Sequence, residues 1–354
     1  MEQHLPLIWA MLIATAVFLY VVMDGFDLGI GILFPWFQDK DERDVMVNSV
    51  APVWDGNETW LVLGGAGLFA VFPLAYATIF PAIYMPLIIM LLALIFRGVS
   101  FEMRFKARGA RAQTWWDRAF SWGSFVAGFC QGIALGALVQ GIRVENRAYA
   151  GGWWDWLTPF SLLTGLALLV GYGLLGACWL IWRTEGAIAA KARHAARLLG
   201  MATLGAIALV SLIMPFLQPA FFERWFAMPW MLRAAPVPIL VVFLAWRFFR
   251  AIPATAEREA SAPHDPTGRH FRWRDGAPFL YALGWFFLAY TGLGISLWPY
   301  IVPPSITIWD AAAAPSSLAF LLVGAVVLLP IILAYTAYTY WIFRGKVRVG
   351  EGYH

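Results

Sequence analysis

Residues 6–34 read PLIWAMLIATAVFLYVVMDGFDLGIGILF, and this stretch decides the fold class. About 20 apolar residues in a row are enough to cross a bilayer as a helix, so the stretch predicts a transmembrane helix. Its only charged side chains are Asp24 and Asp27. A charge inside a membrane costs at least about 2.5 kcal/mol and is rarely kept without a use. The two aspartates therefore predict a functional site late in this helix.

The rest of the chain has the same character. Of its 354 residues, 61% are hydrophobic and 13% are charged, against about 25% charged residues in soluble domains; the mean hydropathy is +0.69. We therefore predict an all-α integral membrane protein. The N-terminus has no basic region and no cleavage site of a signal peptide, so no cleaved leader is expected. Cys130 and Cys178 lie in apolar runs and are expected to be buried thiols.

Nine membrane helices are predicted. The uncharged run 59–96 is too long for one helix and contains Pro73, Pro81 and Pro86, so it predicts a hairpin of two helices that turns near residues 73–78. Together with the first helix, the remaining apolar runs complete the count: 119–142, 156–182, 198–222, 226–249, 276–309 and 311–343.

The basic residues of the loops predict the orientation, because cytoplasmic loops are enriched in Lys and Arg. The loops after helices one, three, five and seven, with the C-terminal tail, hold 21 of the 25 basic residues. Only Arg143, Arg147, Arg224 and Arg233 lie on the other side. The N-terminus is therefore expected in the periplasm and the C-terminus in the cytoplasm. Residues 251–275 are expected to form a cytoplasmic loop. The pI of about 9.1 comes from these loops and does not indicate nucleic-acid binding.

The acidic residues of the first two helices are expected to lie together on the cytoplasmic side. Asp24 and Asp27 are three apart and share a helical face, and Asp55 and Glu58 follow after a short polar loop. The cluster predicts a route for protons or cations. The structural alternative is that Asp24 and Asp27 belong to a packing interface lined by small residues, while Asp55 or Asn57 caps the second helix.

Three more charged residues follow the third predicted helix. Arg97, Glu102 and Arg104 are expected to form structural ion pairs, with the acids of the cluster as possible partners. Asp310 is expected to cap the ninth helix. Several of the 20 tryptophans lie at predicted membrane interfaces and indicate an aromatic belt.

Histidine is absent from all predicted spans, since His4, His194, His264, His270 and His354 lie in termini or loops. A membrane-embedded b-type haem needs axial histidine, so no haem or metal centre is expected in this chain. Nucleotide-binding and hydrolase motifs are also absent from the sequence.

Several motifs lie in order along almost the whole chain: DGFDLG at 24–29, NSVAPVWDGN at 48–57, FRGVSFE at 96–102, WPYIVPPS at 298–305, IWD at 308–310 and PIILAYTAY at 330–338. Together they resemble subunit II of the bacterial cytochrome bd quinol oxidases. Glu58 and the short C-terminus are closer to the cyanide-insensitive branch.

The resemblance implies a heterodimer-based oxidase of the bacterial inner membrane that oxidises quinol and reduces dioxygen to water. It implies that haem b and haem d belong to the partner, subunit I, and that this chain holds none. It also implies two four-helix bundles, 1–142 and 156–309, plus one peripheral helix, 311–343, in a single polytopic domain. A small single-helix accessory subunit, a structural quinone and bound lipid are further possible partners. A proton path from the cytoplasm is implied at the position of Asp55.

The sequence therefore predicts a non-haem subunit that stabilises subunit I and conducts protons inward. Asp55 is the expected carrier, assisted by Asp24, Asp27 and Glu58, with Asn57 as hydrogen-bonding support and Trp54 and Trp60 as walls of the route. One alternative is a proton- or cation-coupled transporter that works alone, although its site would be expected at mid-membrane. The other is a purely structural partner whose acids only cap helices.

Overall fold

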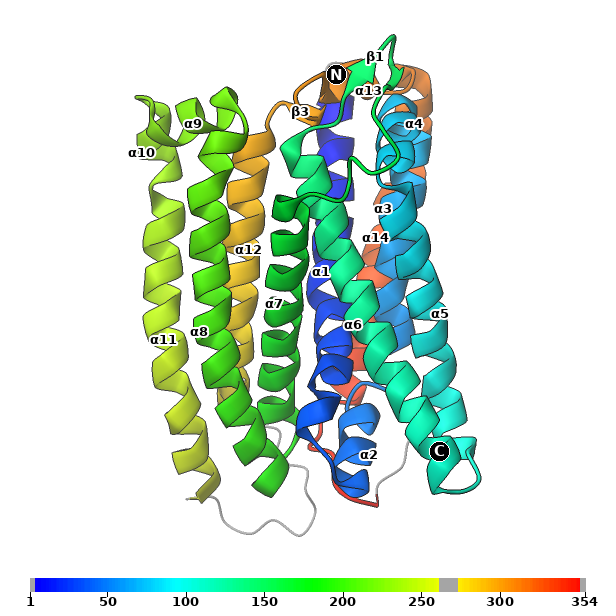
Figure 1. Cartoon of the computed structure of the whole chain (residues 1–354), viewed down its shortest axis with the longest axis vertical. Helices are drawn as coiled ribbons and strands as arrows, with labels where there is room; N and C mark the ends of the chain where they lie inside the picture. The colour runs from blue at the N-terminus through cyan, green and yellow to red at the C-terminus, as the bar shows by residue number, and fades with distance from the viewer. Residues whose placement is uncertain (1–3, 261–272, 351–354) are drawn as a thin grey trace.

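The computed structural model describes residues 4–260 and 273–350. Within these ranges nine helices have 18 residues or more. They are α1 (Leu5–Leu33), α3 (Trp54–Val71), α5 (Tyr84–Lys106), α6 (Ala110–Gln140), α7 (Pro159–Arg183), α8 (Gly186–Leu217), α11 (Pro236–Ala260), α12 (Ala277–Leu297) and α14 (Pro315–Ile342). All run roughly along the long axis of the molecule (Figure 1).

Short elements join the long helices at the two ends. The short helices are α2 (Lys40–Asn48), α4 (Pro73–Ala82), α9 (Pro219–Phe226), α10 (Trp230–Ala234) and α13 (Ile308–Ala311), with 3-10 turns η2 (Phe34–Trp36) and η3 (Trp273–Gly276). Two antiparallel pairs, β1 (Val144–Glu145) with β2 (Ala148–Tyr149) and β3 (Tyr300–Val302) with β4 (Ile306–Thr307), lie at the end opposite α2 (Figure 1).

The prediction of an all-α membrane protein is confirmed. Eight of the long helices in the described ranges are long and apolar enough to cross a membrane. The ninth, α3, is not among them, since its first turns carry Asp55, Asn57 and Glu58. Helix α3 nevertheless runs from the end that holds α2 to the end that holds α4 (Figure 1). The count of nine spans and the orientation of the termini stay predictions.

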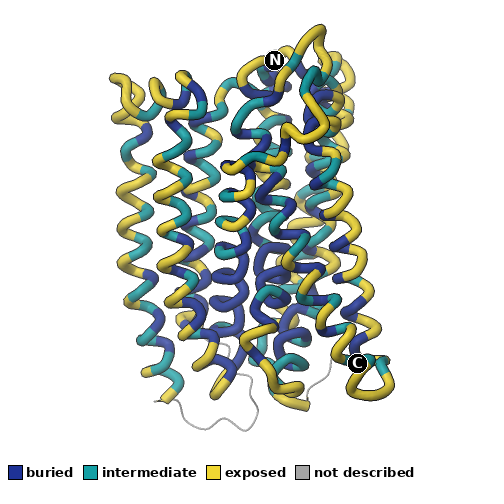
Figure 2. Tube along the Cα trace, viewed as in Figure 1, coloured by how far each residue is buried: buried dark blue, intermediate teal, exposed yellow. Residues whose placement is uncertain are grey.

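Helix α1 is the central element of the arrangement. It packs against α3, α6 and α7, while α5 packs against α6. Helices α8, α11 and α12 lie on the far side of α7, and α14 packs mainly on the outer side of α1 and α3 (Figure 1). The most deeply buried parts of α1 and α7 lie in the half nearest α2 (Figure 2). The acidic residues of α1 are in that half.

Small residues allow α1 and α7 to touch along their backbones. A Cβ atom on Gly29 would lie 2.0 Å from the carbonyl oxygen of Tyr172 and 2.8 Å from the amide nitrogen of Gly176. A Cβ on Gly25 would lie 2.7 Å from the ring of Tyr172. The small residues of DGFDLGIG therefore do form a packing interface: Gly25 and Gly29 face α7, and Gly31 faces Ser124 of α6.

Ion pairs hold α2 against α5 and α6. Arg43 donates to the carbonyl of Phe37 at 2.6 Å and to Asp117 at 3.0 Å. Arg104 lies 2.6 Å from both Asp44 and Asp117. These contacts cover the end of α1 and fix the start of the segment that leads into α3.

Several predicted boundaries were wrong, because helices continue past their apolar stretches. The predicted hairpin turn near 73–78 is itself a helix, α4, and the chain turns at Phe72 and Ile83 instead. Helix α8 starts at Gly186 rather than near 198, and α5 extends through the predicted loop to Lys106. Backbone hydrogen bonding continues where basic side chains can reach water beyond the apolar layer.

The second half of the chain differs in the same way. Part of the predicted loop 251–275 is helical, since α11 reaches Ala260 and η3 begins at Trp273; residues 261–272 lie outside the described ranges. The last long helix begins at Pro315 and not at 311. Asp310 belongs to the preceding short helix α13, where it forms a capping box with Thr307.

Candidate functional site

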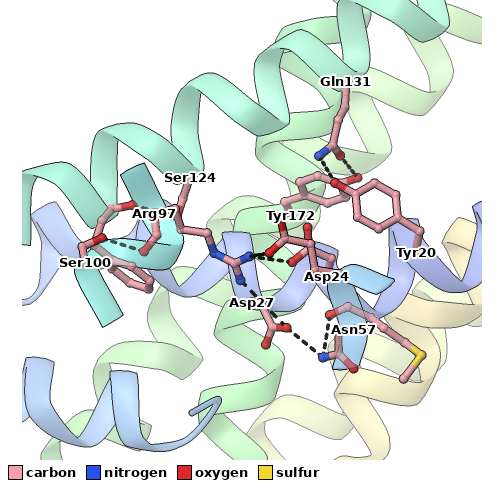
Figure 3. A network of polar contacts seen from close by, with 12 residues as sticks. Tyr20, Asp24, Asp27, Asn57, Arg97, Ser100, Ser124, Gln131 and Tyr172 are labelled. Atoms are coloured by element: carbon pink, nitrogen blue, oxygen red, sulfur yellow. Dashed lines mark hydrogen bonds and ion pairs between the residues drawn. The ribbon is translucent and has the colours of Figure 1, made fainter. Parts of the chain in front are cut away.

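Two carboxyl groups of α1 form the centre of the candidate site. Asp24 and Asp27 are each fully buried, with a relative exposure of 0%. They lie on adjacent turns of α1 and point toward α3 and α5 (Figure 3). Burial at this depth requires opposite charge or hydrogen-bond donors nearby.

Arg97 supplies that charge from α5. It is also fully buried, and its Nη1 donates to Asp24 at 2.9 Å and to Glu58 at 3.4 Å (Figure 3). Its Nη2 lies 4.0 Å from Asp27. One guanidinium therefore contacts three carboxyl groups from two helices.

Two stacked aromatic rings lie beside the guanidinium of Arg97. Trp54 and Phe101 stack on each other with ring centroids 4.6 Å apart. The guanidinium carbon lies 5.7 Å from the centroid of Trp54 and 5.4 Å from that of Phe101. Trp60 is buried and packs with Tyr20. Of the two tryptophans predicted as walls, Trp54 thus lies beside Arg97 and Trp60 beside Tyr20.

Asn57 connects the cluster to a third helix. It is buried, and its Nδ2 donates to Asp27 Oδ2 at 2.7 Å and to the carbonyl of Met23 at 3.4 Å (Figure 3). Its Oδ1 accepts from the hydroxyl of Tyr340, on α14, at 2.8 Å. The amide therefore joins α1, α3 and α14 at one point.

Three polar side chains lie on the membrane-interior side of Asp24. The hydroxyl of Tyr172 donates to Gln131 Oε1, and Gln131 Nε2 donates to the hydroxyl of Tyr20, each at 2.6 Å (Figure 3). Tyr20 precedes Asp24 by one helical turn and interacts with it electrostatically. This arrangement extends the polar network from α1 to α6 and α7.

The remaining acidic residues lie progressively nearer to the surface. Glu58 is half-buried, with 27% of its side chain exposed, and Asp55 is exposed. The prediction that Asp55 or Asn57 caps the second helix is wrong. The N-cap of α3 is Val53, without a side-chain cap. The preceding turn supplies backbone acceptors instead, since Trp54 N donates to the carbonyl of Val50 and Asn57 N to that of Val53.

The three predicted ion-pair residues have different partners. Arg97 pairs with the acids of the cluster. Arg104 pairs with Asp44 and Asp117 instead. Glu102 is exposed and pairs with Lys106 one turn later. Glu102 and Arg104 therefore do not belong to the acidic cluster, although they follow Arg97 closely on α5.

Sequence reasoning missed four members of this network: Tyr20, Gln131, Tyr172 and Tyr340. Tyr20 could have been found, because it lies one turn before Asp24 on the same helix. The others are polar residues in apolar spans, but the sequence has no signal that joins them to α1. Among the described residues, no group of three or more His, Cys, Asp or Glu could hold a metal ion. The described histidines, His4 and His194, are exposed.

The geometry suits proton binding. Three carboxyl groups surround one guanidinium, so full ionisation would leave excess negative charge in a medium where charge is costly. A proton taken up by a carboxyl group removes that excess. Glu58, with 27% of its side chain exposed, is the member of this cluster nearest to the surface.

Comparison with known proteins places the whole chain in one family. The family model for cytochrome bd terminal oxidase subunit II matches residues 5–343. The cytochrome bd-I ubiquinol oxidase subunit 2 of Escherichia coli K12 is 32% identical over 98% of this chain and 96% of its own length. The cytochrome bd ubiquinol oxidase subunit 2 of Bacillus subtilis is 27% identical over 96% of each chain.

A solved structure has the same fold. A chain of the bd oxidase from Geobacillus thermodenitrificans superimposes with a TM-score of 0.73 at 18% identity, over 96% of this chain and 98% of that chain. The chain described here belongs to the cytochrome bd terminal oxidase subunit II family, and it is a multi-pass subunit of an oxidase complex in the bacterial inner membrane.

Proposed function

We propose that this chain is the non-haem subunit of a quinol:dioxygen oxidoreductase, in which it stabilises the haem-bearing subunit I and conducts protons from the cytoplasm. The names of its relatives, which are ubiquinol oxidase subunits, support the reaction. The absence of histidine from the predicted spans supports the placement of haem b and haem d in subunit I.

The proposed route begins at Asp55 and passes through Glu58 to Asp24 and Asp27. The position of Glu58 carries this proposal. Its side chain is 27% exposed and also lies 3.4 Å from the fully buried Arg97, which contacts Asp24 at 2.9 Å. Glu58 therefore reaches both the outside and the buried cluster. Asp55, one turn earlier and exposed, would collect protons at the mouth of the route.

The charge distribution favours protons over metal cations. Arg97 occupies the centre of the cluster and makes the contacts that a bound cation would need. Its positive charge would repel sodium or another cation at that place. Carboxyl groups beside a fixed guanidinium can still gain and lose protons. This argues against the cation-coupled transporter as the alternative function.

The test compares three variants of the complete oxidase: Asp55→Asn, Glu58→Gln and, as a matched control, Glu102→Gln. Asn and Gln keep the size of each side chain but cannot bind and release a proton. We expect Glu58→Gln to slow oxygen consumption and proton uptake about tenfold or more, Asp55→Asn to slow both, and Glu102→Gln to change neither.

The measurement is oxygen consumption with proton uptake from the cytoplasmic side of sealed vesicles. Haem spectra establish that each variant is assembled, and the isolated chain should show no haem band in a pyridine haemochrome assay. If the Asp55→Asn and Glu58→Gln complexes assemble and both work at the wild-type rate, the proton route does not pass through this chain.

A further inference from the structure

Among the hydrogen bonds of the described residues, the one that joins α14 to the acidic cluster is made by Tyr340. Helix α14 otherwise lies on the outside of the molecule, and only 6% of the residues in its most apolar stretch are buried. We propose that Tyr340 is a positioning residue that holds the amide of Asn57 against Asp27 and thereby sets how readily Asp27 takes up a proton. This inference rests on the proposed proton route.

The contacts of Asn57 determine the orientation of its amide. An amide oxygen can only accept hydrogen bonds, and an NH2 group can only donate them. The carbonyl oxygen of Met23 can only accept, so the group of Asn57 that lies 3.4 Å from it must be the NH2. The same NH2 donates to Asp27 at 2.7 Å. The oxygen therefore faces Tyr340, whose hydroxyl donates to it at 2.8 Å.

This orientation distinguishes between the two protonation states of Asp27. The NH2 group of Asn57 stabilises the carboxylate, since a bond to an ionised acceptor is about twice as strong as one between neutral groups. A proton on that same oxygen, Oδ2 of Asp27, would instead need an acceptor, which the NH2 cannot provide. A flipped amide would provide one, but it would turn its oxygen toward the carbonyl oxygen of Met23. The Tyr340 hydroxyl could accept from a flipped NH2 as well, so it does not choose the orientation. Its donation to Oδ1 instead holds the amide in place and polarises it, which strengthens the NH2 as a donor to Asp27.

Other charged groups around Asp27 are held by separate contacts. On α1 the neighbour is Asp24, on α3 it is Glu58, and on α5 it is Arg97, which binds both of them. On α7, Arg183 interacts electrostatically with Tyr340 and donates to the carbonyl of Phe343. Loss of the Tyr340 hydroxyl would remove its interaction with Arg183 and would leave the contacts of Arg97 with Asp24 and Glu58 in place.

The ring of Tyr340 has its own support. It packs edge-on against Trp179 of α7 with ring centroids 6.2 Å apart. A Tyr340→Phe variant keeps this packing and loses only the hydroxyl. Tyr338→Phe is the matched control, since Tyr338 lies on the same helix, is exposed, and stacks on Trp341.

The experiment uses the complete oxidase with two readouts. One is the pH profile of oxygen consumption. The other is the infrared C=O band of protonated Asp27, identified by its loss in Asp27→Asn. For Tyr340→Phe we expect both titrations to move to higher pH, by about one unit for the loss of one hydrogen-bond constraint. Tyr338→Phe should match the wild type.

A second variant tests the same hydroxyl without removing it. Fluorotyrosine at position 340 keeps the ring and is a stronger hydrogen-bond donor, so it should move both titrations in the opposite direction, to lower pH. An assembled Tyr340→Phe complex with wild-type titrations overturns the positioning role, as does a fluorotyrosine complex without a shift.

The two proposals fail separately. The Asp27 band reports on Asp27 directly, so its shift supports the positioning role even if Glu58→Gln shows that protons travel elsewhere. Conversely, a slow Glu58→Gln complex together with an unshifted band in Tyr340→Phe keeps the proton route and removes Tyr340 from it.

Discussion

At the scale of residues, the arrangement around Arg97 explains how three acids can lie together inside a membrane protein. The guanidinium satisfies Asp24 at 2.9 Å and Glu58 at 3.4 Å, and the stacked rings of Trp54 and Phe101 lie beside it on one side. Removing one partner of a buried charged group is far more costly than removing both, because the remaining charge is left without compensation.

Arg97→Leu should therefore destabilise the complex by about 3–5 kcal/mol. The double variant Arg97→Leu with Asp24→Leu should recover part of this loss, since it removes the carboxyl group that Arg97 contacts most closely. The exposed Arg111 gives the control Arg111→Leu, which should have little effect. The measurement is the melting temperature of the purified complex. Equal melting temperatures for Arg97→Leu and Arg111→Leu would contradict the compensating role of Arg97.

Asp310 gives a pH-dependent prediction outside the spans. Hydrogen bonds from the hydroxyl and the backbone N–H of Thr307 lower the pKa of Asp310 below its usual value. A lowered folded-state pKa stabilises the folded form above the unfolded pKa, about 3.9, and this contribution is lost as pH falls through the folded value. Asp310→Asn should lower the melting temperature slightly at pH 7, and the difference from wild type should shrink toward pH 3. A difference that grows on acidification would contradict this sign.

At the scale of elements, the contact of α1 with α7 fixes the position of the acidic face. Glycines on both helices let the backbones touch, so Asp24 and Asp27 are turned toward α3 and α5 on the other side of α1. A side chain at Gly29 would require one helix to move away from the other.

Gly29→Ala should destabilise the complex by about 1–3 kcal/mol, the usual cost of overpacking, because its Cβ would lie 2.0 Å from a backbone oxygen that cannot rotate away. The control is Gly65→Ala on α3, where no heavy atom lies within 4 Å of the added Cβ. That change should be neutral or slightly stabilising, since alanine is the better helix former. Melting temperatures of the two complexes decide the matter, and a Gly29→Ala complex as stable as Gly65→Ala would show that the helices can separate at no cost.

At the scale of the whole molecule, the basic residues and the acidic cluster lie toward the same end. Helix α2, which carries Lys40 and Arg43, lies at one end of the molecule (Figure 1). Asp24 and Asp27 lie in the half of α1 that is nearest to this end. Because the positive-inside rule assigns that end to the cytoplasm, a proton route beginning at Asp55 would open to the cytoplasm.

The orientation can be tested with two reporter fusions. Alkaline phosphatase joined after His354 should be inactive, and a fluorescent protein at the same place should be bright, because both would be cytoplasmic. Phosphatase joined after Gly152, on the side with few basic residues, should be active. Active phosphatase after His354 would reverse the orientation and place the acidic cluster on the periplasmic side.

Much of the fold was predictable because the membrane imposes it. Long apolar runs have to become helices, since unpaired backbone groups are not tolerated in lipid. The limits of the helices were less predictable. Helices α5 and α8 continue through Arg104 and Lys191, although the charge of these side chains predicted loops there. The hydropathy of a segment reports where lipid begins, while backbone hydrogen bonds decide where a helix ends.

The amino-acid sequence by itself determined that this is a membrane protein and that its buried charge gathers around Asp24 and Asp27, because charge in an apolar stretch is visible without any knowledge of contacts. Only the tertiary structure decided which partners those acids have. Arg97 and Arg104 lie two turns apart on one helix, yet one contacts the cluster and the other contacts α2 and α6. Tyr340 is 283 positions from Asn57. Such pairings depend on how the helices pack against one another, which no local pattern of residues records.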